Sequence, residues 1–355
     1  MPDRTEFIER LRQAYRDKKL TLYLGAGVSV ANGIPSWEKL VLAMYFAAIE
    51  KQPAGTRLRP FPNYLFAIAE WHLNRRREPL DITARKIRNL HRDDHFLEEL
   101  KHTLYAGFYQ DENQPAVLDA WGLVSANATL ESVARLCFAR GSQEKTIRAV
   151  ITYNYDCLVE IALANKPIQP IWRSDQVIAP DKLPIYHVHG YVPANGNGST
   201  AAEIIFTEEQ YHLAAQDAYA WSNLVQLQHM TSSVGLMIGL SMTDRNMRRL
   251  LDAIRRTPIR AENYVLLQEP KWQQPSENDI EQIDAQATKY WERFAHSGMK
   301  SSARKFEQIK EIIHQVERRD LEQETAVLTE LGVCPVWYKD HGEIPELVQQ
   351  VMAQE

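Results

Sequence analysis

The sequence predicts an α/β fold of the Rossmann-like, doubly wound kind, in which a parallel sheet is covered by helices on both faces and carries a helical insertion. Short, almost continuously apolar runs alternate with segments of helical periodicity along much of the 355 residues, as strands buried on both faces require. The first run, "LTLYLGAG" at residues 20–27, ends in a glycine turn, which is typical of the opening of nucleotide-binding α/β folds.

The first part of the chain contains one strand pattern and several helix patterns. Residues 5–18 are amphipathic and predict a helix before the first strand, and "SWEKLVLAMYFAAIE" (36–50) predicts a helix after the glycine turn with Ser36 as its N-cap. Between residues 61 and 148 the charge is clustered, the periodicity is helical and no convincing strand occurs. We therefore expect residues 61–148 to form a helical insertion subdomain.

Strand and helix patterns alternate again beyond this insertion, which indicates a parallel, doubly wound sheet. The stretch 271–331 is polar and helical, and we expect it to form additional helices that act as a contact layer. We expect residues 1–355 to form one catalytic unit. The remaining predicted strands are "RAVITYNYD" (148–156), "IQPIW" (168–172), "LPIYHVHGYV" (183–192), the start of "SSVGLMIGLSMTD" (232–244), "ENYVLLQ" (262–268) and "GVCPVWY" (332–338), and the helices between or after them are "CLVEIALANK" (157–166), "RNMRRLLDAIRR" (245–256) and "IPELVQQVM" (344–352).

Composition and charge argue against several classes of function. The net charge of -5 gives no support for nucleic acid as the main ligand, because proteins that bind the phosphate backbone concentrate positive charge. No apolar run approaches the roughly 18 residues that span a bilayer, and the charged start is unlike a signal peptide, so we expect a cytoplasmic protein without membrane contact. The three cysteines, Cys137, Cys157 and Cys334, form no CxxC pair and predict neither a zinc site nor a disulfide framework.

The glycine turn is the first candidate for a binding site. Without side chains, Gly25 and Gly27 would let backbone N–H groups approach a pyrophosphate, although a tight turn without a ligand is the alternative. The dehydrogenase fingerprint GxGxxG needs a third glycine where this chain has Val30, and a P-loop needs a Gly-Lys-Ser/Thr sequence that is absent. The turn therefore matches neither common fingerprint and is followed by Ser29 and by "GIPSW" (33–37).

Three further clusters follow predicted strands, where open α/β sheets bind ligands. In "TYNYD", strand alternation places the Asn154 amide beside the Asp156 carboxylate, unless both residues only cap the next helix. In "HVHG", His187 and His189 would share a face and could form a metal pair, but no other residues complete a ligand set, so we expect no metal. A histidine beside a glycine at the mouth of such a fold also has room to meet a substrate.

The last cluster is "GLSMTDRN" (239–246), where Gly239 and Ser241 precede a helix. A second phosphate contact or a ribose contact is one interpretation, and a simple helix start is the other.

The order of these motifs resembles that of the sirtuin superfamily, whose catalytic core binds NAD. The resemblance covers roughly residues 18–50, 149–270 and 331–350 and consists of GAGxS with GIPxW, then TxNxD, a strand-borne HG, and GxS before a helix. It implies that the GAG turn holds the pyrophosphate, that Asn154 and Asp156 face the nicotinamide ribose and carboxamide, and that His189 is the general base. The NAD-binding residues that it implies are Gly25, Ala26, Gly27, Ser29, Ile34, Pro35, Trp37, Thr152, Gly239 and Ser241.

The chain also departs from the protein deacetylases of this superfamily. Those enzymes read GIPDFR where this chain has "GIPSWE", and they carry a four-cysteine zinc module for which this chain has too few cysteines, so we expect no zinc. Two segments, "IIFTEEQY" (204–211) and "GLSMTDRNMRRLL" (239–251), resemble bacterial sirtuin-like proteins of anti-phage defence, which hydrolyse NAD. The resemblance therefore implies an NAD glycohydrolase that depletes NAD in abortive infection, with NAD as a substrate.

Two alternatives remain open at this point: an NAD-dependent protein deacylase, and a non-catalytic module that senses NAD or ADP-ribose. The resemblance also implies a homo-oligomer and, in some relatives, a separately encoded partner such as a HerA-type ATPase. The insertion at 61–148 and the helices at 271–331 are the expected contact regions.

Overall fold

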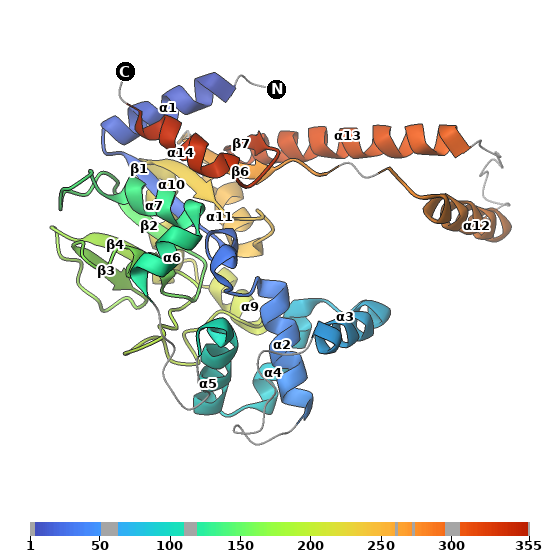
Figure 1. The fold of residues 1–355 in the computed structure, drawn as a ribbon, viewed down its shortest axis with the longest axis horizontal. Coiled ribbons are helices and arrows are strands. Elements are labelled where there is room, and N and C mark those ends of the chain that lie inside the picture. Colours follow the sequence, from blue (N-terminus) through green and yellow to red (C-terminus); the bar gives the residue numbers. More distant parts are fainter. Residues whose placement is uncertain are drawn as a thin grey trace.

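A computed structural model of the chain describes residues 4–50, 63–109, 119–259, 262–271, 274–294 and 306–353, and its centre is one parallel sheet of seven strands (Figure 1). The strand order is β3-β4-β2-β1-β5-β6-β7. Helices cover both faces, so the predicted Rossmann-like α/β fold is confirmed. The strands are β1 (Leu20–Leu24), β2 (Ala149–Thr152), β3 (Ile168–Ile171), β4 (Leu183–His187), β5 (Val234–Ile238), β6 (Glu262–Gln268) and β7 (Val333–Tyr338).

The helices fall into a group that packs on the sheet, a group at the carboxyl ends of the strands, and a pair that projects from the body. They are α1 (Arg4–Arg16), η1 (Ala26–Val28), η2 (Val30–Asn32), α2 (Trp37–Glu50), α3 (Asn63–Arg76), α4 (Leu80–Leu90), α5 (Asp93–Leu104), η3 (Ala106–Phe108), α6 (Ala120–Ala126), α7 (Ala128–Cys137), α8 (Leu158–Ala162), α9 (Glu208–Gln216), α10 (Trp221–Ser232), α11 (Arg245–Arg255), α12 (Glu277–Phe294), α13 (Phe306–Glu330) and α14 (Glu343–Met352).

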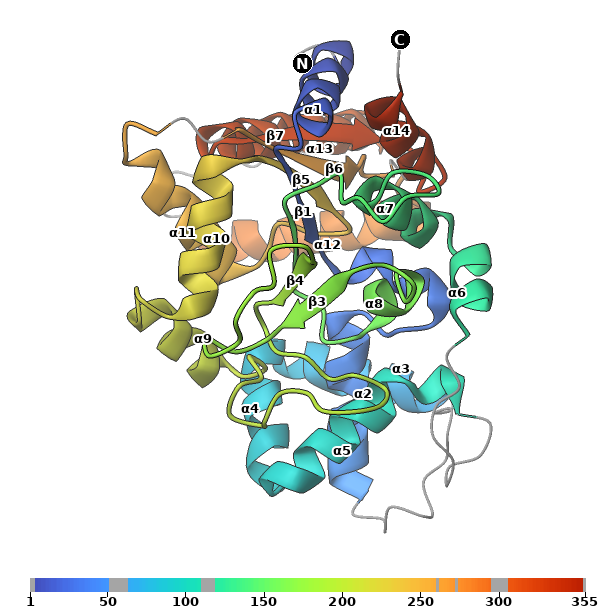
Figure 2. The ribbon, with the colours of Figure 1, turned by 90° about the vertical axis from the view of Figure 1, so that its left-hand side faces the viewer.

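Two hydrophobic cores lie on the two faces of the sheet, because successive strand side chains point in opposite directions. Leu22 and Leu24 of β1 belong to the core beneath α1, α7 and α14, whereas Tyr23 belongs to the core beneath α10 and α11. Figure 2 shows α10 and α11 on one side of the sheet and α7 and α14 on the other. In the parallel register, Leu24 lies beside Thr152 of β2 and Ile238 of β5, so the carboxyl ends of these three strands meet at one place.

The region expected as a helical insertion does not pack as one body. Helices α3, α4 and α5 gather around α2 at the carboxyl ends of the strands, and α4 contacts α9 (Figure 1). Helices α6 and α7 return to the sheet, where α7 packs on α8 and α14. Residues 61–62 and 110–118 of this expected region lie outside the described residues.

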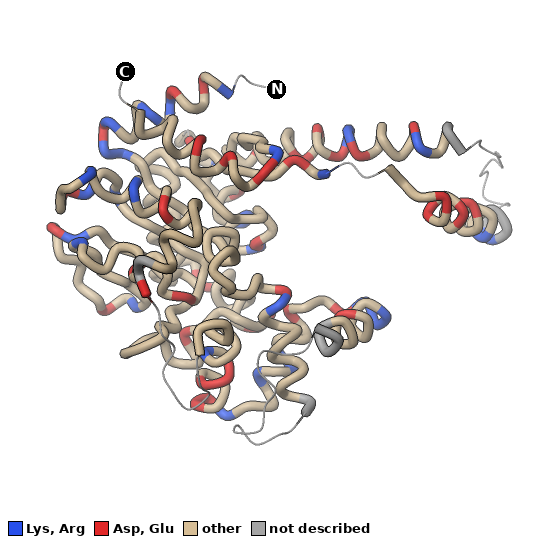
Figure 3. Tube along the Cα trace, in the orientation of Figure 1, with Lys and Arg blue, Asp and Glu red and all other residues tan. Residues whose placement is uncertain are grey.

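The expected contact layer at 271–331 corresponds to α12 and α13, which extend away from the rest of the molecule (Figure 1). The last turns of α13 pack on β7, where Leu328 is buried and Trp337 Nε1 donates a hydrogen bond of 3.2 Å to Thr325 Oγ1. Acidic and basic side chains occur along both helices (Figure 3). Residues 272–273 and 295–305 of this stretch are not described.

Two strands are shorter than the sequence patterns suggest. β2 ends at Thr152 and β4 at His187, so Asn154, Asp156 and His189 follow the strands instead of lying on them. After β4 the chain turns sharply, because the Gly190 N–H bonds back to the His187 carbonyl and Gly190 adopts a φ of 105°.

The sequence patterns did not predict α9 and α10, which connect β4 to β5. Helix α9 begins with a capping box, in which Thr207 and Gln210 exchange hydrogen bonds between side chain and backbone. No described helix is long and apolar enough to cross a membrane.

Candidate functional site

A cavity of about 1120 Å³ opens where the carboxyl ends of β1, β2 and β5 meet. This volume lies just above the range of about 300 to 1,000 Å³ that is usual for small-molecule sites, so the cavity is large enough for a dinucleotide. All the site residues expected from the sequence line it except Ser29 and Thr152. The expected residues in its lining are Gly25, Ala26, Gly27, Ile34, Pro35, Trp37, Asn154, Asp156, His189, Gly239 and Ser241.

The glycine turn lies directly against the turn after β5. The Gly25 N–H donates to the Ile238 carbonyl and the Gly27 N–H to the Gly239 carbonyl, each at 3.0 Å. A Cβ atom on Gly25 would lie 2.4 Å from the Gly239 carbonyl oxygen, so this contact requires glycine. The N–H groups of Gly25 and Gly27 are therefore already bonded, so a pyrophosphate at this turn would need another backbone donor.

Ala26 has the backbone N–H of this turn that remains available to a ligand, whereas its carbonyl already accepts the Ser29 N–H at 2.9 Å. No hydrogen bond among the described residues uses its N–H, and the residue lines the cavity. Gly239 faces the turn from the other side with a φ of 71°, a conformation that favours glycine. The glycines thus allow the ends of β1 and β5 to approach each other closely beside the cavity.

Ser29 is the hydrogen-bonded link between the two polar residues that follow β2. Its hydroxyl donates to Asp156 Oδ1 at 3.2 Å and accepts from Asn154 Nδ2 at 3.3 Å. Asn154 Nδ2 also donates to the Gly25 carbonyl at 3.1 Å, and the Thr152 hydroxyl accepts the Asn154 N–H. Ser29 and Thr152 are buried and lie outside the described lining of the cavity, and their hydrogen bonds orient Asn154 and Asp156.

Asp156 is a buried carboxylate with an unusual protonation equilibrium. Burial raises the pKa of Asp156 to about 6, although hydrogen bonds from the Leu158 N–H and the Ser29 hydroxyl oppose the rise. Leu158 is the first residue of α8, so the carboxylate also lies at a helix N-terminus. Near neutral pH Asp156 is mostly ionised, and a cationic group in the cavity would stabilise that form.

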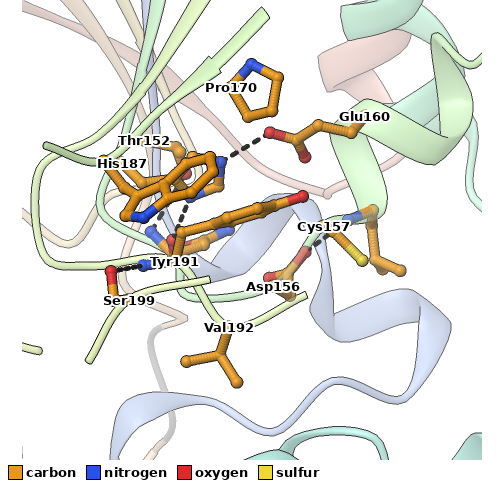
Figure 4. Close-up of polar contacts among 12 residues, drawn as sticks. Thr152, Asp156, Cys157, Glu160, Pro170, His187, Tyr191, Val192 and Ser199 are labelled. Carbon is orange, nitrogen blue, oxygen red and sulfur yellow. Dashed lines mark hydrogen bonds and ion pairs between the residues drawn. The ribbon is translucent and has the colours of Figure 1, made fainter. Parts of the chain in front are cut away.

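His187 has a structural role on the side of Asn154 that faces away from the cavity. Its Nε2 lies 2.6 Å from Glu160 Oε1 and its Nδ1 lies 3.1 Å from the Asn154 carbonyl (Figure 4). This pair connects β4 and α8 to the loop that carries Asn154. His187 therefore does not share a site with His189, and the described residues contain no group of three that could hold a metal ion.

His189 points into a different environment, with an aromatic ring on each side and a carboxylate beside it. The rings of Tyr153 and Tyr211 meet its imidazole edge-to-face at centroid distances of 5.0 and 5.5 Å. Its Nε2 lies 3.5 Å from Asp244 Oδ2. Burial lowers the pKa of His189 and Asp244 opposes that shift, so the imidazole is neutral at pH 7 and available as a base.

Several residues in or behind the lining escaped the sequence analysis. Asp244 was detectable only as the residue before a predicted helix, and it caps α11 by accepting the Met247 N–H at 2.7 Å. Tyr153 and Tyr211 also line the cavity, but no local pattern distinguishes a lining tyrosine from a core one. Helical periodicity also cannot show that the expected insertion contributes Pro79, Leu80, Asp81, Leu104 and Thr129 to the lining.

Two buried side chains from the expected insertion hold the loops of the site. The amide nitrogen of Asn127 donates to the Val28 carbonyl at 2.8 Å and to Asn32 Oδ1 at 2.6 Å, which fixes the turn after β1. The hydroxyl of Tyr105 donates to the Val192 carbonyl at 2.8 Å and accepts the Cys157 N–H at 3.1 Å, which fixes the loop beside Asp156.

The fold and the cavity define an α/β protein with a nucleotide-sized site at the switch point of a parallel sheet. A protein-family model described as a SIR2-like domain matches residues 148–292, which include Asn154, Asp156, His189 and Asp244. This match supports a place in the sirtuin-like superfamily and implies NAD binding and NAD-related activity. The comparison with curated proteins finds no match for the chain.

Proposed function

We propose that this protein is an NAD glycohydrolase, which cleaves NAD with water to give nicotinamide, ADP-ribose and a proton. The observation that carries the proposal is the convergence of Asn154, Asp156 and the neutral base His189 on one cavity beside the glycine turn. The three residues follow two different strands, and the SIR2-like match spans all of them.

The charges in the cavity favour one orientation of the dinucleotide. The nicotinamide end of NAD is cationic, and the carboxylates of Asp156 and Asp244 both line the cavity, with Asp244 beside His189. The pyrophosphate is anionic, and the Ala26 N–H at the start of η1 is an available donor for it. We therefore place the nicotinamide riboside beside Asp156 and the pyrophosphate over the glycine turn.

The reaction needs little acid assistance, because nicotinamide leaves as a neutral molecule with the electron pair of the broken C–N bond. Positive charge develops on the ribose, and the Asp156 carboxylate stabilises it. Asn154 is held in one orientation by Gly25 and Ser29, and this orientation serves to position the carboxamide or the attacking water. His189 accepts a proton from the water or from a ribose hydroxyl, a step that commonly contributes about 10²- to 10⁴-fold.

A nicotinamide-release assay tests the proposal. Purified protein is incubated with NAD, and nicotinamide and ADP-ribose are separated by chromatography. We expect both products in equal amounts from the wild-type chain, and a loss of at least about 100-fold in turnover for His189→Ala and Asn154→Ala. Product formation that needs an acyl-lysine peptide would instead identify a deacylase.

The matched control is His229→Asn. His229 is also a buried histidine, but it lies outside the cavity lining and bonds to Thr21 Oγ1 at 3.2 Å. We expect this variant to retain turnover once its folding has been verified by thermal melting. Calorimetric binding of NAD without any product in any assembly state would overturn the proposal in favour of a sensing module.

We further propose that cleavage depletes NAD during anti-phage defence and that assembly controls it, because a freely active enzyme would harm its own cell. The support is the resemblance of residues 204–211 and 239–251 to defence proteins. The proposed assembly is a homo-oligomer, with a HerA-type ATPase as a candidate second component. Turnover measured together with sedimentation, with and without such an ATPase, tests this; equal turnover of the isolated chain and every assembly would contradict it.

A further inference from the structure

Asp244 has two carboxylate oxygens with two different neighbours. Oδ1 accepts the Met247 N–H at 2.7 Å and thereby caps α11. Oδ2 lies 3.5 Å from His189 Nε2. The hydrogen bond from Met247 fixes the orientation of the Asp244 side chain, and this orientation keeps Oδ2 directed toward His189.

The two nitrogens of His189 are not equivalent. Nε2 is buried and has no hydrogen bond to the described residues, and the nearest charged group to it is Asp244. A buried ring N–H requires an acceptor, so a proton on Nε2 is stabilised by the Asp244 carboxylate. This tautomer leaves Nδ1 as the nitrogen that accepts a proton from a substrate.

We propose that Asp244 is a positioning residue for His189, which keeps one proton on Nε2 and stabilises the imidazolium that forms when Nδ1 takes a second one. The proton comes from the attacking water or a ribose hydroxyl, and the resulting positive ring lies beside the negative carboxylate. This inference rests on the proposed NAD hydrolysis for its role in turnover, but not for its effect on His189 itself.

The surroundings of His189 leave Asp244 as its main electrostatic partner. Tyr153, after β2, and Tyr211, on α9, lie edge-to-face against the ring. Burial raises the pKa of both tyrosines, and the charge of Asp244, which also accepts a hydrogen bond from the Tyr211 hydroxyl, adds to the rise, so both stay neutral. The charge of Asp81 on α4 also raises the pKa of Tyr211, and Asp81 forms an ion pair with Arg245 at 3.2 Å. Burial of the imidazole lowers the pKa of His189, and the Asp244 charge counteracts this.

The test is Asp244→Asn, because an asparagine oxygen still accepts the Met247 N–H and keeps the cap while the charge is lost. NMR titration of histidine-labelled protein gives the pKa of His189, with His189→Gln to assign the signal. We expect the pKa of His189 to fall by about one unit in Asp244→Asn. In the same variant, turnover of NAD should fall about 10- to 100-fold, and the acid limb of its pH profile should move to lower pH.

Two further variants make the test decisive. Asp252→Asn removes a carboxylate from the same helix, where it pairs with Arg255 and Arg256 outside the cavity, and we expect the pKa of His189 to stay unchanged. Asp244→Ser keeps a capping hydroxyl and should repeat the effect of Asp244→Asn, which covers the case that the asparagine variant does not fold.

An unchanged pKa of His189 in both Asp244 variants, or an equal shift in Asp252→Asn, would overturn the proposal. If the wild-type chain does not cleave NAD, the proposed function fails, yet the titration still decides the role of Asp244.

Discussion

The helices of the expected insertion at 61–148 and the α12–α13 pair are both additions to the same sheet, but their polar side chains have different partners. In the first region, buried side chains reach the loops of the site: Asn127 bonds to Val28 and Asn32, and Tyr105 bonds to Val192 and Cys157. In the second region, polar contacts run mostly within a helix, as between Arg318 and Glu322. In Figure 1, α12 and α13 extend away from α2 and α9, whose residues line the cavity.

The two regions, 61–148 and 271–331, were both expected to be contact regions, but their positions relative to the cavity give them different roles. The first region contributes Leu80, Asp81 and Leu104 to the lining of the cavity, so a substitution that unfolds this region should also disrupt the site. The α12–α13 pair contributes no residue to that lining. It exposes apolar side chains instead, among them Tyr290, Ile312 and Val316. Substitutions in the two regions should therefore have different consequences.

Asn127→Ala should cause the largest loss. It removes the cap of α7 and leaves the Val28 carbonyl without its donor, which together should lower the free energy of unfolding by about 3 kcal/mol. The turn after β1 should also loosen, so we expect the KM for NAD to rise about 10-fold. Chemical denaturation and steady-state kinetics measure the two effects. Asn278→Ala on the exposed surface of α12 is the matched control and should change neither quantity.

Asp156→Asn should have the next largest effect, in the opposite direction. The pKa of Asp156 is about 6 in the folded protein against 3.8 for an ordinary aspartate, so the folded state retains the proton longer than the unfolded state. The contribution of Asp156 to stability therefore falls as the pH rises from about 4 to about 6, and the loss persists above that range.

An asparagine at this position does not titrate. Its side-chain oxygen can still accept hydrogen bonds from the Leu158 N–H and the Ser29 hydroxyl. At pH 8 we expect the variant to exceed the wild type in free energy of unfolding by about 2 kcal/mol, and near pH 3.5 the two should be similar. Denaturation at several pH values measures this, and a constant difference across the range would contradict it. NAD turnover should be lost in the same variant.

The strands could be predicted from the sequence more completely than the helices. Continuous apolar runs such as "LTLYL" and "VGLMI" identify buried parallel strands, because neither face meets water. Helices α9 and α10 were missed. The buried side chains of α10, Asn223 and Gln226 among them, include polar residues that interrupt the expected apolar pattern.

Asn154, Asp156 and His189 could be named from the sequence because they follow predicted strands, where open α/β sheets bind ligands, and because the order of their motifs resembles the sirtuin superfamily. The site was not predictable where the role depends on a distant partner. The N–H groups of Gly25 and Gly27 are bonded to the end of β5 and to Gly239, and the sequence does not show that these segments lie side by side. Asp244 likewise became visible only when α11 and the end of β4 were brought together.

The ion pair between Asp81 and Arg245 should have a smaller effect. It joins α4 to the start of α11 at 3.2 Å, at a partly exposed position beside the cavity. Exposed pairs contribute roughly 0 to 1 kcal/mol, so a double-mutant cycle of Asp81→Asn and Arg245→Gln should give a coupling energy below about 1 kcal/mol. The KM for NAD should change about two-fold, and high salt should remove the coupling. A coupling that high salt leaves unchanged would show that the two residues interact by other means.

The smallest effect on folding and turnover should come from the α12–α13 pair, although its effect on assembly should be clear. Ile312 and Val316 are 40% and 60% exposed on α13, so replacing both with serine should alter the free energy of unfolding by less than about 0.5 kcal/mol. If a second copy of the chain covers this surface, the double variant should sediment at a lower mass than the wild type.

Leu90→Ser provides the matched control, because Leu90 is 63% exposed at the end of α4 in the other region. We expect it to leave the sedimentation of the wild type unchanged. Dissociation by Leu90→Ser alone would move the contact surface to the helices around the cavity, where an interface could act on catalysis directly. Dissociation by the α13 variant with unchanged single-chain turnover would instead mean that assembly and chemistry use separate additions to the sheet. Two routes would then connect them: β7, on which α13 packs, and α11, whose Arg255 pairs with Glu330 of α13 at 2.6 Å.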